Sequence, residues 1–159
     1  TTTGTITAGG FTTTGELSAT TRKFTKTSDT VADHNGDVVF FGNTADMTRG
    51  AIYHYRSNGT WELADPTAVA TCDGLLAVAL GTASDDNGML LRGMVTLDHD
   101  PGTLGDVLYL KGGDGSEGDA SATPPSGNTH IIRIIGYCLD STDGQIWFDP
   151  DKTFVEVTA

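Results

Sequence analysis

Short apolar runs separated by Gly, Asn and Asp make up most of the chain from residue 36 onward. Several of them alternate apolar and polar positions, which is the two-residue period of a half-buried β-strand. No stretch sustains the i, i+3, i+4, i+7 spacing of an amphipathic helix. The sequence therefore predicts an all-β fold, a single β-sandwich or flattened β-barrel of eight or more short strands. The expected strands cover residues 36–41, 51–55, 60–63, 75–80, 89–97, 107–110, 131–139, 145–148 and 154–157.

Turn-forming residues separate these runs. The dipeptide Asn58-Gly59 lies between two expected strands and predicts a β-hairpin. Residues 85–88 end in Asn-Gly and predict a turn. A single helical turn is expected at residues 65–70, which open with Asp-Pro, and a loop is the alternative. Residues 111–130 are rich in Gly, Asp and Pro, so we expect a long surface loop there.

Two parts of the chain resemble each other, which suggests an internal duplication. The copies would form two similar halves that close one barrel or sandwich. Chance recurrence of short β motifs is the alternative. The matching stretches are 36–41 with 105–110, 75–82 with 134–141, and 88–91 with 144–147.

The N-terminal region differs from the rest of the chain. Residues 1–30 contain thirteen Thr and four large apolar side chains, those of Ile6, Phe11, Leu17 and Phe24. This composition buries too little surface to order the segment alone, and Thr favours extended backbone. We therefore expect an extended N-terminal arm over residues 1–35 and a β domain over 36–159. The arm is predicted to lie on neighbouring subunits, with the four apolar side chains as assembly contacts.

The charge balance excludes two classes of partner. The chain has 9 Lys and Arg against 21 Asp and Glu, a net charge of -12. Nucleic acid and anionic membranes are polyanions, so neither is an expected partner. No stretch approaches the apolar length of a membrane span, and no secretory signal is expected. Eleven of the acidic residues lie from Asp98 onward, and we expect the face that they form to point to solvent.

Two short segments place a His between oxygen ligands and are candidate metal sites. They are Asp33-His34-Asn35-Gly36-Asp37 and Asp98-His99-Asp100-Pro101-Gly102. Neither supplies a complete ligand set for zinc or calcium by itself. Asp, Asn and Gly are also the usual turn formers, so we expect turns and no metal or other cofactor. A metal that bridges two segments is the alternative.

No pattern of residues singles out a catalytic site, and we expect no enzyme activity. Cys138 lies in an apolar run and is expected to be a buried, inert thiol, whereas Cys72 is expected to be more exposed. Both are predicted to stay unpaired. A sugar-stacking platform is imaginable, although aromatic residues on strands usually belong to a core or an interface. Its members would be Tyr53, Tyr55, Trp61 and Trp147.

Several motifs resemble those of virion structural proteins of tailed bacteriophages, the small β domains of head decoration (cement) proteins and of fibre or spike proteins. The resemblance covers roughly residues 36–157 and leaves the Thr-rich arm unmatched. It implies an all-β fold, assembly on the virion and no catalytic residues. The motifs that carry it are residues 74–81 (GLLAVALG), 88–98 (GMLLRGMVTLD), 105–110 (GDVLYL), 135–140 (IGYCLD) and 146–151 (IWFDPD).

The resemblance leads to one main functional hypothesis. A homotrimeric capsid decoration protein would bind the major capsid protein or other virion proteins on the outer head surface after assembly in the host cytoplasm. The small size and the extended arm favour this hypothesis over a fibre, which normally shows a repetitive shaft. The alternative is a tail fibre or spike subunit, or a module that binds host glycans. An acid glycosidase is the third and weakest hypothesis.

Overall fold

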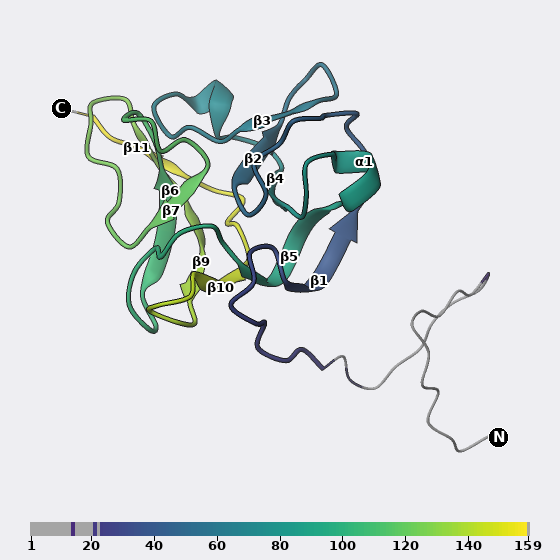
Figure 1. The fold of residues 1–159 in the computed structure, drawn as a ribbon. Helices are drawn as coiled ribbons and strands as arrows, with labels where there is room; N and C mark the ends of the chain where they lie inside the picture. Colours follow the sequence, from purple (N-terminus) through teal and green to yellow (C-terminus); the bar gives the residue numbers. More distant parts are fainter. Residues whose placement is uncertain (1–13, 15–20, 22, 159) are drawn as a thin grey trace.

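The computed structural model describes residues 14, 21 and 23–158, and the fold in this part of the chain is almost entirely β (Figure 1). The predicted fold class is confirmed, with eleven short strands among the described residues. In chain order the elements are β1 (His34–Val39), β2 (Ile52–Tyr55), β3 (Trp61–Leu63), η1 (Val69–Thr71), β4 (Leu76–Ala79), α1 (Ser84–Asn87), β5 (Met89–Thr96), β6 (Val107–Lys111), β7 (Asp119–Ser121), β8 (Ile131–Ile132), β9 (Ile134–Cys138), β10 (Gln145–Phe148) and β11 (Val155–Glu156).

Nine of the strands form one antiparallel sheet that curls into a half-barrel. Its order is β3-β2-β4-β5-β10-β9-β6-β7, and β1 pairs with β5 outside this path. The remaining strands, β8 and β11, form a separate two-stranded sheet. Within the described residues, no helix is of a length and apolarity that would cross a membrane.

Two glycines within strands allow the sheet to curl. Gly93 in β5 and Gly136 in β9 have φ values of 139° and 153°, which other residues rarely adopt. Both lie opposite Phe148 of β10, whose side chain is fully buried. A Cβ at Gly136 would lie 1.9 Å from the carbonyl oxygen of Trp147. Glycine at such points lets strands bend around a core.

Alternating residues of the first strands pack into two different clusters. Ile52 of β2 and Val78 of β4 belong to the main core inside the curl. Their neighbours Tyr53 and Ala79 belong to a second cluster on the outer face of the same strands. Residues 40–50 cover that outer face, and the edge strand β3 extends it. Their contributions to the second cluster are Phe41, Met47, Trp61 and Leu63.

The structure differs from the sequence-based expectations at three places. The expected surface loop 111–130 contains β7, where Ala120 is almost fully buried. The expected turn 85–88 forms the single helical turn α1. The helical turn expected at 65–70 is instead the 3-10 turn η1, which begins at Val69. Asp65 accepts hydrogen bonds from Thr67 and does not cap η1, whose N-cap residue is Ala68.

The strand pairing does not repeat between the two halves that the duplication matched. β1 pairs with β5, the third element of its copy, whereas β6 pairs with β9, the second element of the other copy. The two halves therefore share strand sequences but not one pairing scheme. The predicted boundary at residue 36 also falls inside a strand, because β1 begins at His34.

Candidate assembly surface

An apolar row crosses the outer face of the sheet, on the side away from the main core. Trp147 of β10 lies opposite Met94 of β5 on one side and opposite Tyr137 of β9 on the other. Tyr137 in turn lies opposite Val107 of β6. Residues directly opposite each other in neighbouring strands share a face and contact each other. We call these four residues the apolar row.

The N-terminal segment 23–33 passes beside β5 and β10 (Figure 1), the strands that carry Met94 and Trp147. The ring of Phe24 packs edge-on against Trp147, with 5.8 Å between the ring centroids. The amide of Asn35 donates to the carbonyl oxygen of Thr25 at 3.0 Å. Lys26 forms an ion pair with Asp140 in the β9–β10 loop. This part of the predicted arm therefore contacts its own sheet.

Two further contacts hold the same segment at the end of β5. The side chain of Thr27 is buried and its hydroxyl is hydrogen-bonded to that of Thr96 at 3.0 Å. The Thr96 hydroxyl also donates to the carbonyl oxygen of Ser28 at 2.6 Å. The hydrogen bond from Lys26 and those from Thr142 lower the pKa of Asp140 to about 2. The segment is thus attached by both apolar and polar contacts.

Arg92 also covers Trp147, in addition to Phe24. The guanidinium of Arg92 lies 5.7 Å from the centroid of the Trp147 ring, within the range of a cation–π interaction. The same guanidinium forms an ion pair with Asp149, at 3.1 Å between Nε and Oδ1. Because Phe24 and Arg92 already contact Trp147, its ring is not a free stacking surface.

The other end of the row has no such cover among the described residues. Tyr137 is 48% exposed, the largest exposed fraction of any Tyr or Trp there. Val107, Tyr109 and Ile134 surround it and are half-buried. We call these four residues the open face. Beside it lies a cavity of about 410 Å³, lined by Ile134, Tyr137 and residues 149–152.

The predicted assembly contacts can be placed only in part. Ile6, Phe11 and Leu17 lie outside the described residues. Phe24 is described, and it is half-buried on Trp147 of its own chain. Sequence reasoning missed the open face itself. The signal was available in the expected strands 107–110, 131–139 and 145–148, but the pairing of those strands is needed to bring their outward residues together.

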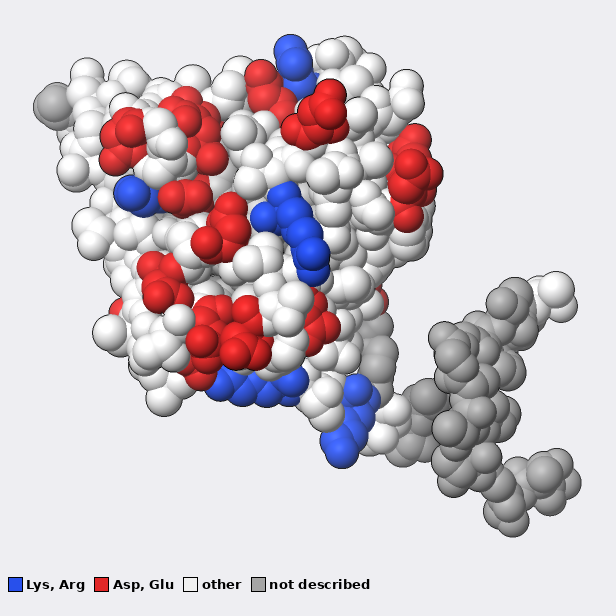
Figure 2. Space-filling view, viewed as in Figure 1, with Lys and Arg blue, Asp and Glu red and all other residues white. Residues whose placement is uncertain are grey.

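The charge on the rest of the surface is mostly negative. Figure 2 shows groups of acidic side chains over the visible face, with fewer basic side chains among them. Several ion pairs are exposed, such as Arg56–Glu62 at 3.2 Å. Two acidic surfaces of this kind repel each other at moderate ionic strength. Close contact between copies therefore favours surfaces that lack this charge.

Of the two candidate metal segments, 98–102 gains a third residue in the structure. Asp98, His99 and Asp119 of β7 place their ligand atoms within 4.8 Å of one another. The Nε2 atom of His99 accepts a hydrogen bond from the backbone N–H of Ala120 at 2.9 Å, so its Nδ1 carries the proton and donates to Asp98 at 2.8 Å. Both ring nitrogens are thus engaged within the protein, and this geometry fits a structural link between the loop and β7.

The protonation of His99 reflects opposing influences. Burial lowers its pKa, but the hydrogen bond to Asp98 and the negative charges of Asp119 and Asp98 together raise it above the usual value. Burial raises the pKa of Asp119. The acidic neighbours therefore favour the protonated form of the imidazole more than solvent does.

The other candidate metal segment is not the expected turn: a turn at residues 31–32 precedes it, and His34 to Asp37 lie in β1. The carboxylate of Asp33 accepts hydrogen bonds from the backbone N–H groups of Ser28 at 2.7 Å and His34 at 3.0 Å. The bond from Ser28 is the main reason that the pKa of Asp33 is lowered. The Nδ1 atom of His34 lies 2.9 Å from the carbonyl oxygen of Ala32. These contacts shape the entry into β1.

The two cysteines are free thiols, and both are buried. The expectation that Cys72 is the more exposed one is wrong, because its side chain is completely buried and belongs to the main core. Its thiol donates to the carbonyl oxygen of Ala68 at 3.2 Å. Burial raises the pKa of Cys72 to about 11 and also raises that of Cys138. A thiol that stays protonated is a poor nucleophile.

Three of the four aromatic residues considered as a sugar platform belong to the second cluster. Trp61 is 4% exposed, stacks on Phe41 at 5.6 Å between centroids, and donates from Nε1 to the Phe41 carbonyl oxygen at 2.8 Å. Tyr55 packs against both rings. Tyr53 is buried, and its hydroxyl accepts from the backbone N–H of Thr48. These aromatic residues form a core.

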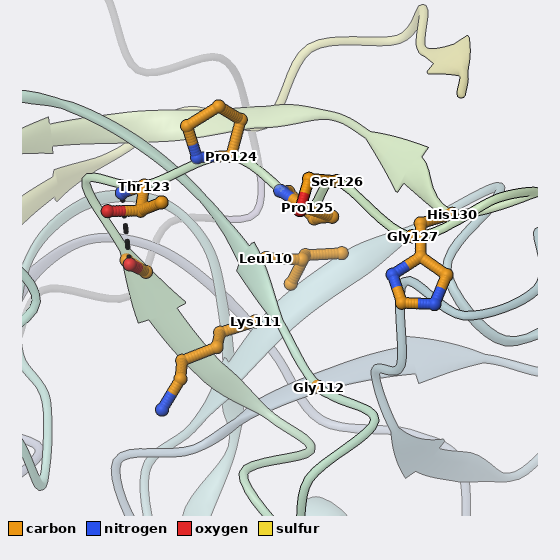
Figure 3. A pocket seen from close by; sticks show the side chains of 10 residues that line it. Leu110, Lys111, Gly112, Thr123, Pro124, Pro125, Ser126, Gly127 and His130 are labelled. Carbon is orange, nitrogen blue, oxygen red and sulfur yellow. Dashed lines mark hydrogen bonds between the residues drawn. The ribbon is translucent and has the colours of Figure 1, made fainter. Parts of the chain in front are cut away.

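A second cavity, of about 250 Å³, lies between β6 and the loop 123–130. Figure 3 shows Leu110 below the loop prolines, with His130 at one end and Lys111 extending away from the prolines. The hydroxyl oxygen of Ser121 accepts from the backbone N–H of Thr123 at 3.0 Å. The imidazole and the ammonium group do not converge, so the cavity offers no paired catalytic groups.

No known protein family, curated protein or solved structure matches this chain.

Proposed function

We propose that this chain is a structural protein of a tailed-bacteriophage virion, a capsid decoration (cement) protein and not an enzyme. It binds the outer surface of the head as a homotrimer and stabilises the shell. The motifs that resemble phage β domains support this role. The single observation that carries it is the open face, an apolar surface on a sheet that its own chain covers elsewhere. Such surfaces are typical of sites that contact another protein.

Stabilisation would follow from mass action. A protein that binds only the assembled shell lowers its free energy relative to dissociated subunits. The net negative charge would keep free copies soluble and apart before they bind. We therefore expect heads that carry this protein to release their DNA at a higher temperature than heads that lack it.

Electron cryo-microscopy of the virions that carry this chain tests the proposal. The expected result is density for the curled sheet at symmetric positions on the outer head surface. Density at a tail fibre or spike would support the alternative and overturn the head assignment. Absence of the protein from purified virions would overturn both.

A further inference from the structure

The apolar row is covered at one end by an extended segment, and this indicates how its other end is covered. Phe24 shows that a side chain from extended backbone can pack onto this row. Beyond Lys23 the chain has twenty-two more residues, which carry Ile6, Phe11 and Leu17 among Thr and Gly. Like the segment that covers Trp147, these residues are rich in Thr and carry isolated large apolar side chains.

Charge favours this segment over the rest of the molecule as the partner of the open face. Residues 1–22 carry one acidic residue, Glu16, and one basic residue, Arg22, so their net charge is zero. The whole chain has a net charge of -12, and all of that net charge therefore lies in residues 23–159. A neutral segment can approach an acidic domain without the repulsion that two such domains exert on each other.

The course of the segment favours a neighbouring copy over the same copy. Ser28 contacts Thr96, which lies opposite Gln145 at the start of β10, and Phe24 contacts Trp147 two residues further along that strand. Going towards the N-terminus, the segment therefore runs along β10, in the direction of the Arg92–Asp149 ion pair. The open face lies sideways from this course, across β9 and β6.

We infer that the open face binds residues 1–22 of a neighbouring copy, so that copies are joined by exchanged N-terminal segments. The inference rests on the proposed function for the expectation that copies associate, but the exchange itself needs no phage head. Apolar side chains of the segment pack around Tyr137, as Phe24 packs on Trp147. Each copy thereby donates one segment and receives another.

Photo-crosslinking tests the contact directly. The full-length chain carries p-benzoylphenylalanine in place of Tyr137, and equal amounts of ¹⁴N and ¹⁵N protein are unfolded, mixed and refolded together before irradiation. The expected product joins residue 137 of one isotope to a peptide from residues 1–22 of the other. Products that join only equal isotopes would place the segment on its own copy and overturn the inference. Absence of any product with residues 1–22 would overturn it as well.

Self-association of soluble full-length variants gives a second test. We expect Tyr137→Asp to raise the dissociation constant of self-association about tenfold or more, as loss of a central aromatic contact does. Leu75→Asp is the matched control, because Leu75 is 41% exposed and lies outside the row. It should leave the constant unchanged. Circular dichroism establishes that both variants are folded.

The outcomes separate this inference from the proposed function. A full-length chain that stays monomeric at all concentrations, or a Tyr137→Asp variant that associates like the unchanged protein, overturns the exchange. Head binding is measured separately, with heads that lack the protein. If copies exchange segments but do not bind heads, the exchange stands and the head assignment fails alone.

Discussion

The two halves of the curled sheet differ in how far the side chains on their outer faces are buried. In the half built on β2 and β4, the outward side chains Tyr53, Ala77 and Ala79 are buried beneath residues 40–50. In the half built on β9 and β6, the outward side chain of Tyr137 is 48% exposed. Both halves nevertheless contribute to one main core on the inner face.

The connections that follow β1 and β6 explain this difference. The connection after β1 contains Phe41 and Met47, which reach back over the sheet. The connection after β6, residues 112–118, has the sequence Gly-Gly-Asp-Gly-Ser-Glu-Gly and no apolar side chain. Among the described residues, one half therefore covers its own outer face, and the other leaves Tyr137 largely exposed. The difference lies in the loops and not in the strands.

Truncation of Trp61, a large side chain of the second cluster, has the largest expected effect. Trp61→Ala removes a nearly buried ring that contacts Phe41 and Tyr55. We expect a loss of about 3–5 kcal/mol in the free energy of unfolding, from lost transfer energy and the cavity left behind. Urea denaturation of the full chain measures it. A loss below about 1 kcal/mol would show that this face does not need its cover.

Truncation of the partial cover in the second half has a smaller expected effect. Phe24→Ala removes one aromatic pair with Trp147, and we expect a loss of about 1 kcal/mol. Trp147 fluorescence and urea denaturation report it, and Trp61→Phe removes the signal of the second tryptophan. An unchanged emission of Trp147 would contradict the contact.

Acid should weaken the packing of Phe24 on Trp147 and should leave the second cluster unchanged. The folded pKa of Asp140 is about 2, below the ordinary 3.8, because Lys26 and Thr142 donate to its carboxylate. The contribution of Asp140 to docking is thus complete above pH 4 and is lost as the pH falls from about 4 to 2. The indole N–H resonance of Trp147 should shift in this range, while that of Trp61 stays fixed.

Asp140→Asn is the control for this titration. It removes the carboxylate but keeps an acceptor for Thr142, so the Trp147 resonance should no longer respond between pH 4 and 2. A response that persists in this variant would assign the effect to another carboxylate.

The smallest effect on folding is expected at the open face. Tyr137→Ser should change the free energy of unfolding of the monomer by less than about 0.5 kcal/mol, since exposed side chains contribute little. Urea denaturation at a concentration where the protein is monomeric checks it. A loss comparable to that of Trp61→Ala would mean that Tyr137 belongs to the core, and the contrast between the halves would disappear.

Local patterns were enough to predict most of the strands. The hairpin at Asn58-Gly59 is confirmed, with Tyr55 opposite Trp61 and Gly59 at a φ of 86°. The strand predicted at 145–148 matches β10 in both bounds. Apolar runs bounded by turn residues depend on nearby sequence, and for this reason they could be recognised without the fold.

Features that depend on distant contacts could not be predicted in this way. β7 has only three residues, and it is a strand because it pairs with β6. Cys72 follows a turn and is buried by parts of the chain that the turn does not reveal. The open face requires the pairing of β10 with β9 and of β9 with β6. Nothing in any single run distinguishes Tyr137 from the buried Tyr53.

The side chain of Arg133, between β8 and β9, bears on the order of folding events. Its guanidinium is nearly fully buried and donates to the carbonyl oxygens of Cys72, Gly74 and Asp151, at 2.7, 2.8 and 2.7 Å. These residues lie 61, 59 and 18 positions away in the chain. The guanidinium can give up its water only when all three segments have arrived, because an unpaired buried charge is costly. Closure of this contact is therefore a late step, and a chain still in synthesis keeps Arg133 hydrated until Asp151 has emerged.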